Sequence, residues 1–172
     1  MITELRQAIA EKLNEIENIG VVHHYERYAR ETKIFGDFYI WQPPTLDVTE
    51  ENPKPKKPPE ELRGGFIRWV STENEVKGNA TYHRYNWELQ YFLALSEKAE
   101  TQVKFDDVLE RILGALTSTV LMQTIQGFST DKGVMTLKGQ PQMFYNQHAM
   151  FAGNLVHHGK IKFTTELRVM GV

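Results

Sequence analysis

The clearest pattern in the chain is an alternation of apolar and polar residues between Arg84 and Ser96. Polar side chains occupy the even positions from Arg84 to Gln90, and only Phe92 and Ala94 depart from the pattern before Ser96. Apolar or aromatic side chains occupy the odd positions, namely Tyr85, Trp87, Leu89, Tyr91, Leu93 and Leu95. Because successive side chains of a strand point to opposite faces, the segment is predicted to be a strand with one buried face and one wet face.

The C-terminal segment repeats this alternation over residues Lys160–Met170. Lysine, threonine, glutamate and arginine fill its even positions, and the odd positions hold Ile161, Phe163, Thr165, Leu167 and Val169. Two long strands of this kind predict a sheet that is covered on a single face.

Two amphipathic helices are predicted to supply that cover. The first, Thr3–Ile16, has apolar residues spaced three and four apart, and the second, Asp106–Leu121, has a broader apolar stripe with Asp106 or Asp107 as its N-cap. We therefore predict one α+β domain over residues 1–172. It should hold a single antiparallel or mixed sheet with two helices packed on one face.

Weaker patterns predict further strands and turns between these elements. Gly78 and Asn79 indicate a β-hairpin before the long strand, and the His157–Gly159 segment indicates a bend before the last one. Shorter strand-like runs occupy Val21–Tyr28, Ile34–Trp41, Phe66–Val70, Gln126–Phe128, Val134–Lys138 and Met143–Phe151, with a turn at Asp131–Gly133.

The segment Pro43–Arg63 interrupts the pattern. It contains six of the seven prolines among many Glu and Lys residues. Proline has no N–H for a sheet ladder, and this composition buries too little surface to offset the entropy of ordering. We predict a long, exposed, flexible loop, which is either an insertion without function or a binding element.

Composition narrows the class of protein. The net charge of −2 gives no electrostatic reason to expect nucleic-acid or anionic-membrane binding, and the absence of cysteine excludes disulfides, thiolate metal sites and a cysteine nucleophile. The N-terminal segment does not look like a secretory signal, and no apolar run is long enough to span a bilayer. We expect a protein of a reducing compartment that does not enter membranes.

No pattern of catalytic residues stands out. The six histidines lack the spacing of metal-binding helices, the serines lack a nucleophile turn, and the glycines match no phosphate-binding loop. We predict no catalytic residue, no metal and no cofactor, and therefore no enzyme. One alternative stays open: a small-molecule-binding or enzymatic α+β domain with an apolar cavity, for which His23, Asp37 and Tyr85 are the candidate residues.

The order of elements resembles the tail-terminator and tail-completion (minor tail) proteins of long-tailed phages. The stretch YNWELQYFLAL…FDDVLERILGAL is similar to the central strand and helix of that family, and KIKFTTELRVMGV is similar to its closing strand. The resemblance covers most of the chain outside Pro43–Arg63. That segment and residues Gln123–Gly159 depart from the shorter family members.

This resemblance implies a structural virion protein. Such a protein forms a ring-like homo-oligomer, such as a hexamer, at the end of the tail tube, where it ends tube polymerisation and joins the tail to the head. The implied partners are further copies of the chain, the tail tube protein and the head connector protein, with no membrane and no sequence-specific nucleic acid. The implied location is the host cytoplasm during assembly and the virion tail afterwards. A different head–tail connector or a contractile secretion-apparatus subunit is a further alternative.

We predict that the proline-rich segment is an assembly interface that becomes ordered in the assembled state. The concentration of charge and proline in one place is the reason for this expectation. The candidate interface residues are Pro43, Pro44, Lys54, Lys56, Lys57, Glu60, Glu61 and Arg63.

Overall fold

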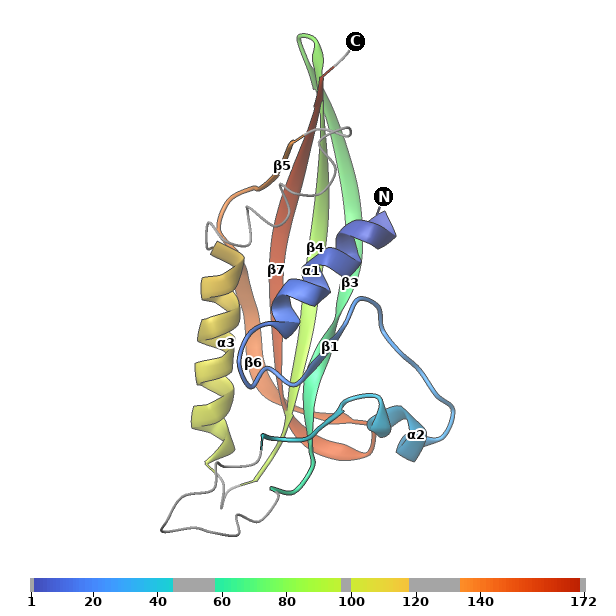
Figure 1. Ribbon diagram of the computed structural model, residues 1–172, viewed down its shortest axis with the longest axis vertical. Helices are drawn as coiled ribbons and strands as arrows, with labels where there is room; N and C mark the ends of the chain where they lie inside the picture. Colours follow the sequence, from blue (N-terminus) through green and yellow to red (C-terminus); the bar gives the residue numbers. More distant parts are fainter. Residues whose placement is uncertain (1, 45–57, 97–99, 118–133, 171–172) are drawn as a thin grey trace.

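The computed structural model describes residues 2–44, 58–96, 100–117 and 134–170. Within these ranges the chain forms three helices and one mixed sheet of seven strands (Figure 1). The elements are α1 (Ile2–Asn14), β1 (Val21–His23), α2 (Thr32–Asp37), β2 (Ile40–Trp41), β3 (Glu61–Lys77), β4 (Ala80–Ala94), α3 (Thr101–Thr117), β5 (Val134–Leu137), β6 (Gln142–Phe151) and β7 (Asn154–Met170).

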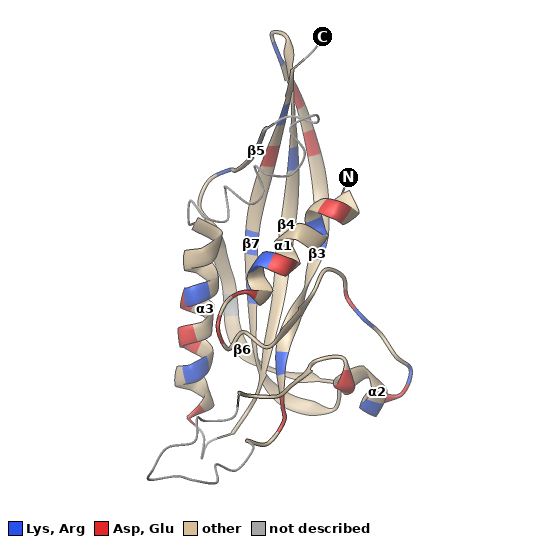
Figure 2. Cartoon of the chain, viewed as in Figure 1, with Lys and Arg blue, Asp and Glu red and all other residues tan. Residues whose placement is uncertain are grey.

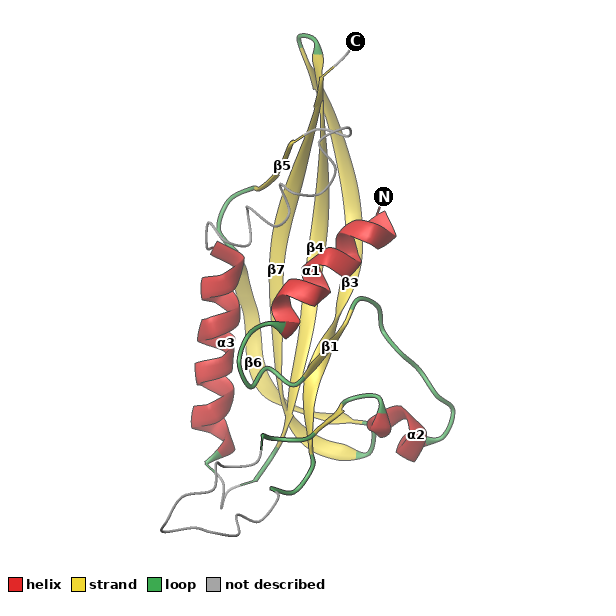
Figure 3. Ribbon diagram, in the orientation of Figure 1, coloured by secondary structure: helices red, strands yellow, loops and turns green. Residues whose placement is uncertain are grey.

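Three long strands form the centre of the sheet. β4 lies between β3 and β7 and is antiparallel to both, so that Trp87 is paired with Trp69 on one side and Phe163 on the other. β1 pairs in parallel with β3, and the two residues of β2 pair with the first residues of β3. On the far side, β6 and β5 pair with successive stretches of β7 (Figure 3).

The predicted hairpin is confirmed, although its strands are longer than expected. β3 and β4 stay paired up to Lys77 and Ala80, which leaves only Gly78 and Asn79 for the turn. Gly78 has a φ of +61°, a left-handed conformation that glycine adopts at little cost. The turn lies at one extremity of the molecule, beyond both long helices (Figure 1).

Helices α1 and α3 cover what we call the first face of the sheet. The odd side chains of β4 from Tyr85 to Leu93 are all buried there, as the alternation predicts. Leu5, Ile9 and Leu13 of α1 pack into the same cluster, as do residues of α3 and the odd positions of β7, including Phe105, Leu109, Ile112, Ile161, Phe163 and Leu167. The prediction of two one-sided helices and two one-sided strands is confirmed for this face.

The opposite face, here the second face, is wrongly predicted to be wet along its whole length. Glu88 and Gln90 are buried, and Phe92 belongs to a second apolar cluster. The members of this cluster are Tyr39, Leu62, Phe66, Phe92, Phe151 and Val156. The fold is therefore α+β and mostly sheet, with apolar clusters on both faces, and not a sheet with two helices on one face only.

The segment Ile34–Trp41 explains this difference. It is not one strand, because its first half forms α2, a third helix that sequence analysis did not predict. Phe35 of α2 packs against Phe151 with ring centroids 4.9 Å apart, and Tyr39 lies 5.0 Å from the same ring. A partner more than 100 positions away in the chain thus fixes this segment against the second face.

Several boundaries also differ from the prediction. α3 begins at Thr101, so Asp106 and Asp107 lie inside the helix and do not cap it. The histidines of the His157–Gly159 segment are buried inside β7, and the actual turn before that strand lies at Ala152 and Gly153. Position 159 is a glycine because α3 packs closely against β7 there. A Cβ added at this position would lie 3.0 Å from the side chain of Leu109.

The remaining strand predictions have mixed outcomes. Val21–Tyr28 contributes only the three residues of β1, whereas β5 and β6 confirm the runs Val134–Lys138 and Met143–Phe151. The run Gln126–Phe128 and the turn Asp131–Gly133 lie outside the described residues.

The predicted loop Pro43–Arg63 is shorter than expected. Glu61, Leu62 and Arg63 belong to β3, and Arg63 is only 6% exposed. The reason is β2, which pairs with Glu61 and Leu62 and so extends the sheet into the proline-rich segment. Residues 45–57 lie outside the described ranges.

Candidate assembly surface

Strand β6 forms an exposed edge of the sheet, here called the β6 edge. It pairs with β7 on one side, and no strand in the described parts of the chain pairs with its other side. Its sequence QMFYNQHAMF contains no Lys, Arg, Asp, Glu or Pro. Soluble proteins ordinarily protect a long edge strand with these residues, because an unprotected edge pairs with other chains.

Apolar side chains on this strand are exposed to solvent. Met143 is 39% exposed and Met150 is 68% exposed, and Phe144 and the nearby Leu155 are exposed as well. The neighbouring residues of β7 from Val156 to Gly159 are buried. Exposed apolar residues gathered on an unpaired strand are typical of a surface that a partner covers.

The second exposed edge is the stretch Arg68–Lys77 of β3, here called the β3 edge. β1 pairs only with residues up to Phe66, and beyond that point no described strand lies on this side of β3. Trp69, Val70 and Val76 are exposed on it. Unlike the β6 edge, it carries charged residues, namely Arg68, Glu73, Glu75 and Lys77.

The β3 edge is part of an arm formed by the ends of the three central strands around the hairpin turn. On its second face, Arg84 Nε donates a hydrogen bond to Glu166 Oε2 at 2.7 Å, and Arg84 Nη2 donates to Glu75 Oε2 at 2.8 Å. Bonds from Lys77 and Arg84 hold the pKa of Glu75 below its usual value. Charges of both signs therefore alternate along the arm (Figure 2).

A groove of about 570 Å³ lies where the proline-rich segment leaves the sheet. Gln42 holds the two ends of that segment together, since its Nε2 donates to the carbonyl oxygens of Pro58 at 2.7 Å and Pro43 at 3.3 Å. The groove is lined by Asn18, Trp41, Pro43, Pro44, Pro58, Pro59, Glu61, Arg63, Lys104, Asp107 and Arg111.

The groove brings together half of the predicted interface residues. Pro43, Pro44, Glu61 and Arg63 line it, and Glu60 is exposed beside them. The other three, Lys54, Lys56 and Lys57, lie outside the described residues. Sequence analysis did not single out the groove's α3 residues, because only the fold places α3 next to the start of β3.

Arg63 has a structural role at the floor of this groove. Its guanidinium lies 5.0 Å from the centre of the Trp41 ring, and its Nη1 donates to Glu61 Oε1 at 3.0 Å. Next to it, burial raises the pKa of Tyr91 to about 12, and the Tyr91 hydroxyl donates to the carbonyl oxygen of Ile19 at 2.5 Å. Arg63 is thus a buried residue of the sheet and not part of an exposed loop.

A buried polar chain crosses the second face at the boundary between the apolar cluster and the arm. His158 Nε2 lies 2.5 Å from Gln90 Oε1 and Gln90 Nε2 donates to Glu88 Oε1, while Lys160 Nζ lies 3.5 Å from Glu88 Oε2. Burial, and then the charge of Lys160, lower the pKa of His158 to about 4 despite the opposing effect of Glu88. The sequence pattern did not predict this buried hydrogen-bond network, because Glu88 and Gln90 occupy the polar positions that were expected to face solvent.

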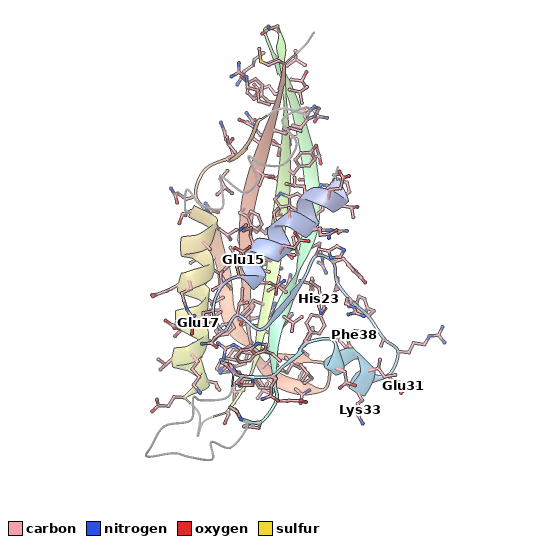
Figure 4. All side chains as sticks on the ribbon, viewed as in Figure 1. Glu15, Glu17, His23, Glu31, Lys33 and Phe38 are labelled. Atoms are coloured by element: carbon pink, nitrogen blue, oxygen red, sulfur yellow. The ribbon has the colours of Figure 1, made fainter. Side chains whose placement is uncertain are left out.

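The residues of the alternative ligand-binding hypothesis lie on separate elements. His23 Nε2 is 2.6 Å from the carbonyl oxygen of Phe38, and burial lowers the pKa of His23 (Figure 4). Tyr85 is buried on the first face beside Trp87, whereas Asp37 is exposed at the end of α2. The half-buried His23 and the buried Tyr85 each have a structural explanation of their own.

Two of the other histidines, His148 and His157, lie close together. His157 Nε2 lies 2.9 Å from Thr101 Oγ1, and the rings of His148 and His157 are 5.0 Å apart. Over the described ranges, no group of three or more His, Asp or Glu side chains is arranged to hold a metal ion. In the same ranges, no helix combines the length and apolar character needed to cross a bilayer.

Comparisons with known proteins add no family. No protein-family model matches the chain. No curated protein matches it either.

Proposed function

We propose that this protein is a structural subunit of a phage-tail-type assembly. In this proposal it forms a ring at the end of a tail tube, ends tube polymerisation and joins the tail to the head. The observation that carries the proposal is the β6 edge, a ten-residue strand without charge or proline whose Met143 and Met150 are exposed.

An open sheet edge favours association with another chain. Unpaired backbone groups and exposed methionines give a free subunit a strong tendency to associate. A structural subunit uses this tendency, because association is its function. The order of the long strands and of α1 and α3, which resembles that of tail-terminator proteins, supports the same conclusion.

A ring further requires two different surfaces on each subunit, since its contacts are head-to-tail. The β6 edge and the β3 edge meet this requirement because they belong to opposite sides of the sheet. The proposed partners are other copies of the chain, the tube protein and the head connector protein. The proposed location is the host cytoplasm during assembly and the virion tail thereafter.

The proline-rich segment is proposed to contact one of these partners. Gln42 holds its two ends together at the groove, because its Nε2 donates to the carbonyl oxygens of Pro43 and Pro58. Replacing residues 45–57 with a short Gly-Ser linker should leave the subunit folded and reduce assembly. This deletion spares Glu61–Arg63, which belong to β3. Unchanged assembly would remove the segment from the proposal.

The experiment that tests the function has two measurements. Native mass spectrometry of the purified chain over a range of concentrations should show a closed oligomer of defined copy number. Electron microscopy of tail tubes polymerised with and without the chain should show that the tubes stop growing when it is present. A chain that stays monomeric and leaves tube length unchanged would overturn the proposal.

A further inference from the structure

We propose that the β6 edge of one copy pairs with the β3 edge of the next copy as an antiparallel extension of the sheet. This inference rests on the proposed ring function and names the contact that would build the ring. Three independent features of the described residues support it: strand direction, the positions of the bulges and the exposed apolar residues.

Strand direction is the first feature. β3 and β7 run the same way, because both are antiparallel to β4, and β6 is antiparallel to β7. Copies related by rotation about a common axis keep the component of each strand's direction along that axis. The β3 edge of a neighbour therefore meets the β6 edge antiparallel, which continues the alternation of the sheet.

The bulges fit each other as well. β6 has ten residues with an irregularity between Met143 and Tyr145, and the β3 edge, residues 68–77, also has ten with an irregularity between Trp69 and Ser71. When Gln142 is placed opposite Lys77 of the neighbour, each strand has one unpaired bulge residue, Phe144 or Val70. Every remaining pair then has both side chains on the same face of the extended sheet.

This register also matches the exposed apolar residues. Met143 is paired with Ile161 and Val76 with Thr81, so both lie on the first face. They come directly opposite each other, and Val76 is 72% exposed in the free subunit. At the other end, Met150 comes opposite Trp69, which is 43% exposed. Cross-strand pairs of this kind are the units that stabilise a sheet.

Charge does not oppose this contact. The β6 edge carries no Lys, Arg, Asp or Glu, so no charged residue of the neighbour's β3 edge comes directly opposite a charge of the same sign. Behind β6, Lys162 is paired with Gln142, which faces the neighbour's Lys77, and Lys160 is paired with Tyr145, which faces the neighbour's Glu75.

The contact also determines the shape of the assembly. Gln142 is paired with Lys162 of β7. Lys77 is paired with Ala80 of β4, and Ala80 is paired with Met170 of β7, eight residues further along that strand. Each copy is therefore displaced along the strands by about 27 Å, from eight residues at about 3.4 Å each. A sheet with such a stagger closes only when its strands are tilted to the axis, as in a barrel.

The absence of cysteine makes a crosslinking test direct, because engineered thiols have no competitors. We expect the double variants Met143→Cys with Val76→Cys and Met150→Cys with Trp69→Cys to form disulfides between copies under mild oxidation, since opposite residues of an antiparallel pair have Cα atoms about 4.5–5.5 Å apart, within the range that a disulfide spans. The matched control is Met143→Cys with Glu75→Cys, which places the second thiol on the other face and should stay reduced.

A second variant keeps the test independent of disulfide geometry. Met150→Lys puts a charge on the β6 edge at an exposed position, so the subunit should fold normally while assembly requires a concentration about tenfold higher or more. Val103→Lys introduces the same charge at an equally exposed position on α3 and should not change assembly.

The outcomes separate the inference from the function. Rings that form in the wild type but show neither crosslink, and that tolerate Met150→Lys, would overturn this contact and leave the ring proposal standing. A wild-type chain that never assembles, even with the tube protein, would overturn the proposed function itself. Crosslinked open filaments would support the contact and contradict closure into a ring.

Discussion

The two ends of the long sheet are built from the same three strands, yet they are covered in different ways. In the base of the sheet, around Phe66, Phe92 and Val156, apolar clusters pack on both faces. In the arm, around Tyr82, Arg84 and Glu166, the second face carries ion pairs, and no strand among the described residues pairs with the β3 edge. One run of alternating residues in β4 passes through both environments.

This difference teaches what an alternating pattern means. The alternation determines which side chains share a face, because that follows from the geometry of a strand. It does not determine whether the face is covered, because the cover comes from other parts of the chain. Stability should therefore be concentrated in the base, while the arm and the β6 edge are free to bind.

The largest expected effect comes from truncating one aromatic residue at each end of the second face and comparing the two losses of stability. Phe92→Ala removes a ring that stacks on Phe151 at 3.9 Å and on His158 at 4.5 Å, and we expect the free energy of unfolding to fall by about 3–5 kcal/mol. Tyr82→Ala, ten residues earlier in the same strand, should cost less than about 1 kcal/mol. Chemical denaturation measures both, and equal losses would contradict the comparison.

The next effect concerns pH and the buried polar chain at the boundary between base and arm. Because the pKa of His158 is about 4 in the folded protein and about 6.5 in an unfolded chain, the unfolded state binds more protons between these values. The free energy of unfolding should therefore fall by about 2–3 kcal/mol as the pH decreases from 6.5 to 4. It should be insensitive to this group above pH 7.

His158→Gln checks the assignment of this effect. Glutamine can still donate to Gln90 but does not take up a proton, so this part of the pH dependence should disappear. Loss of the ring that stacks on Phe92 should lower the free energy of unfolding by a similar amount at every pH. Denaturation curves at pH 8, 6 and 4.5 provide the measurement. A variant with the full wild-type slope would show that other groups are responsible.

The smallest expected effect compares two neighbouring threonines on opposite faces of β7. Thr165 is fully buried on the first face and accepts a hydrogen bond from Trp87 Nε1 at 2.8 Å. Thr165→Val leaves that buried donor without a partner and should cost about 1–3 kcal/mol. Thr164→Val removes a bond to Asn86 on the partly exposed second face and should cost less. Equal losses would show that the two faces are equally solvated at this level, and a reversed order would contradict the prediction.

Sequence analysis identified the elements whose signal is local. The stripes of α1 and α3 and the alternations of β4 and β7 repeat at the period of a helix or a strand, and the structure contains all four. It missed α2 and the second apolar cluster, because Phe35 and Tyr39 become core residues only through contact with Phe151. It interpreted Gly159 as a bend, although that glycine provides space for Leu109 of α3.

The candidate surface shows the same division. The sequence predicted a strand at Met143–Phe151 and directed attention to Pro43–Arg63 as an interface. It gave no reason to prefer β6, because the residues of a strand do not reveal whether the strand lies at the centre or the edge of a sheet. The absence of charge in QMFYNQHAMF becomes informative only once the fold shows that no strand in the described ranges pairs with the outer side of β6.

The sequence by itself determined the α+β class, the two long helices and the residues that form the first face. Backbone geometry and the burial of apolar side chains act over a few neighbouring residues, so these features are encoded locally. Only the tertiary structure decided which faces are covered and whether His158 is buried. It also decided that β6 and the Arg68–Lys77 stretch of β3 lie at the edges of the sheet, where no described strand pairs with them. Those properties depend on which distant segments meet, and no local pattern specifies such a meeting.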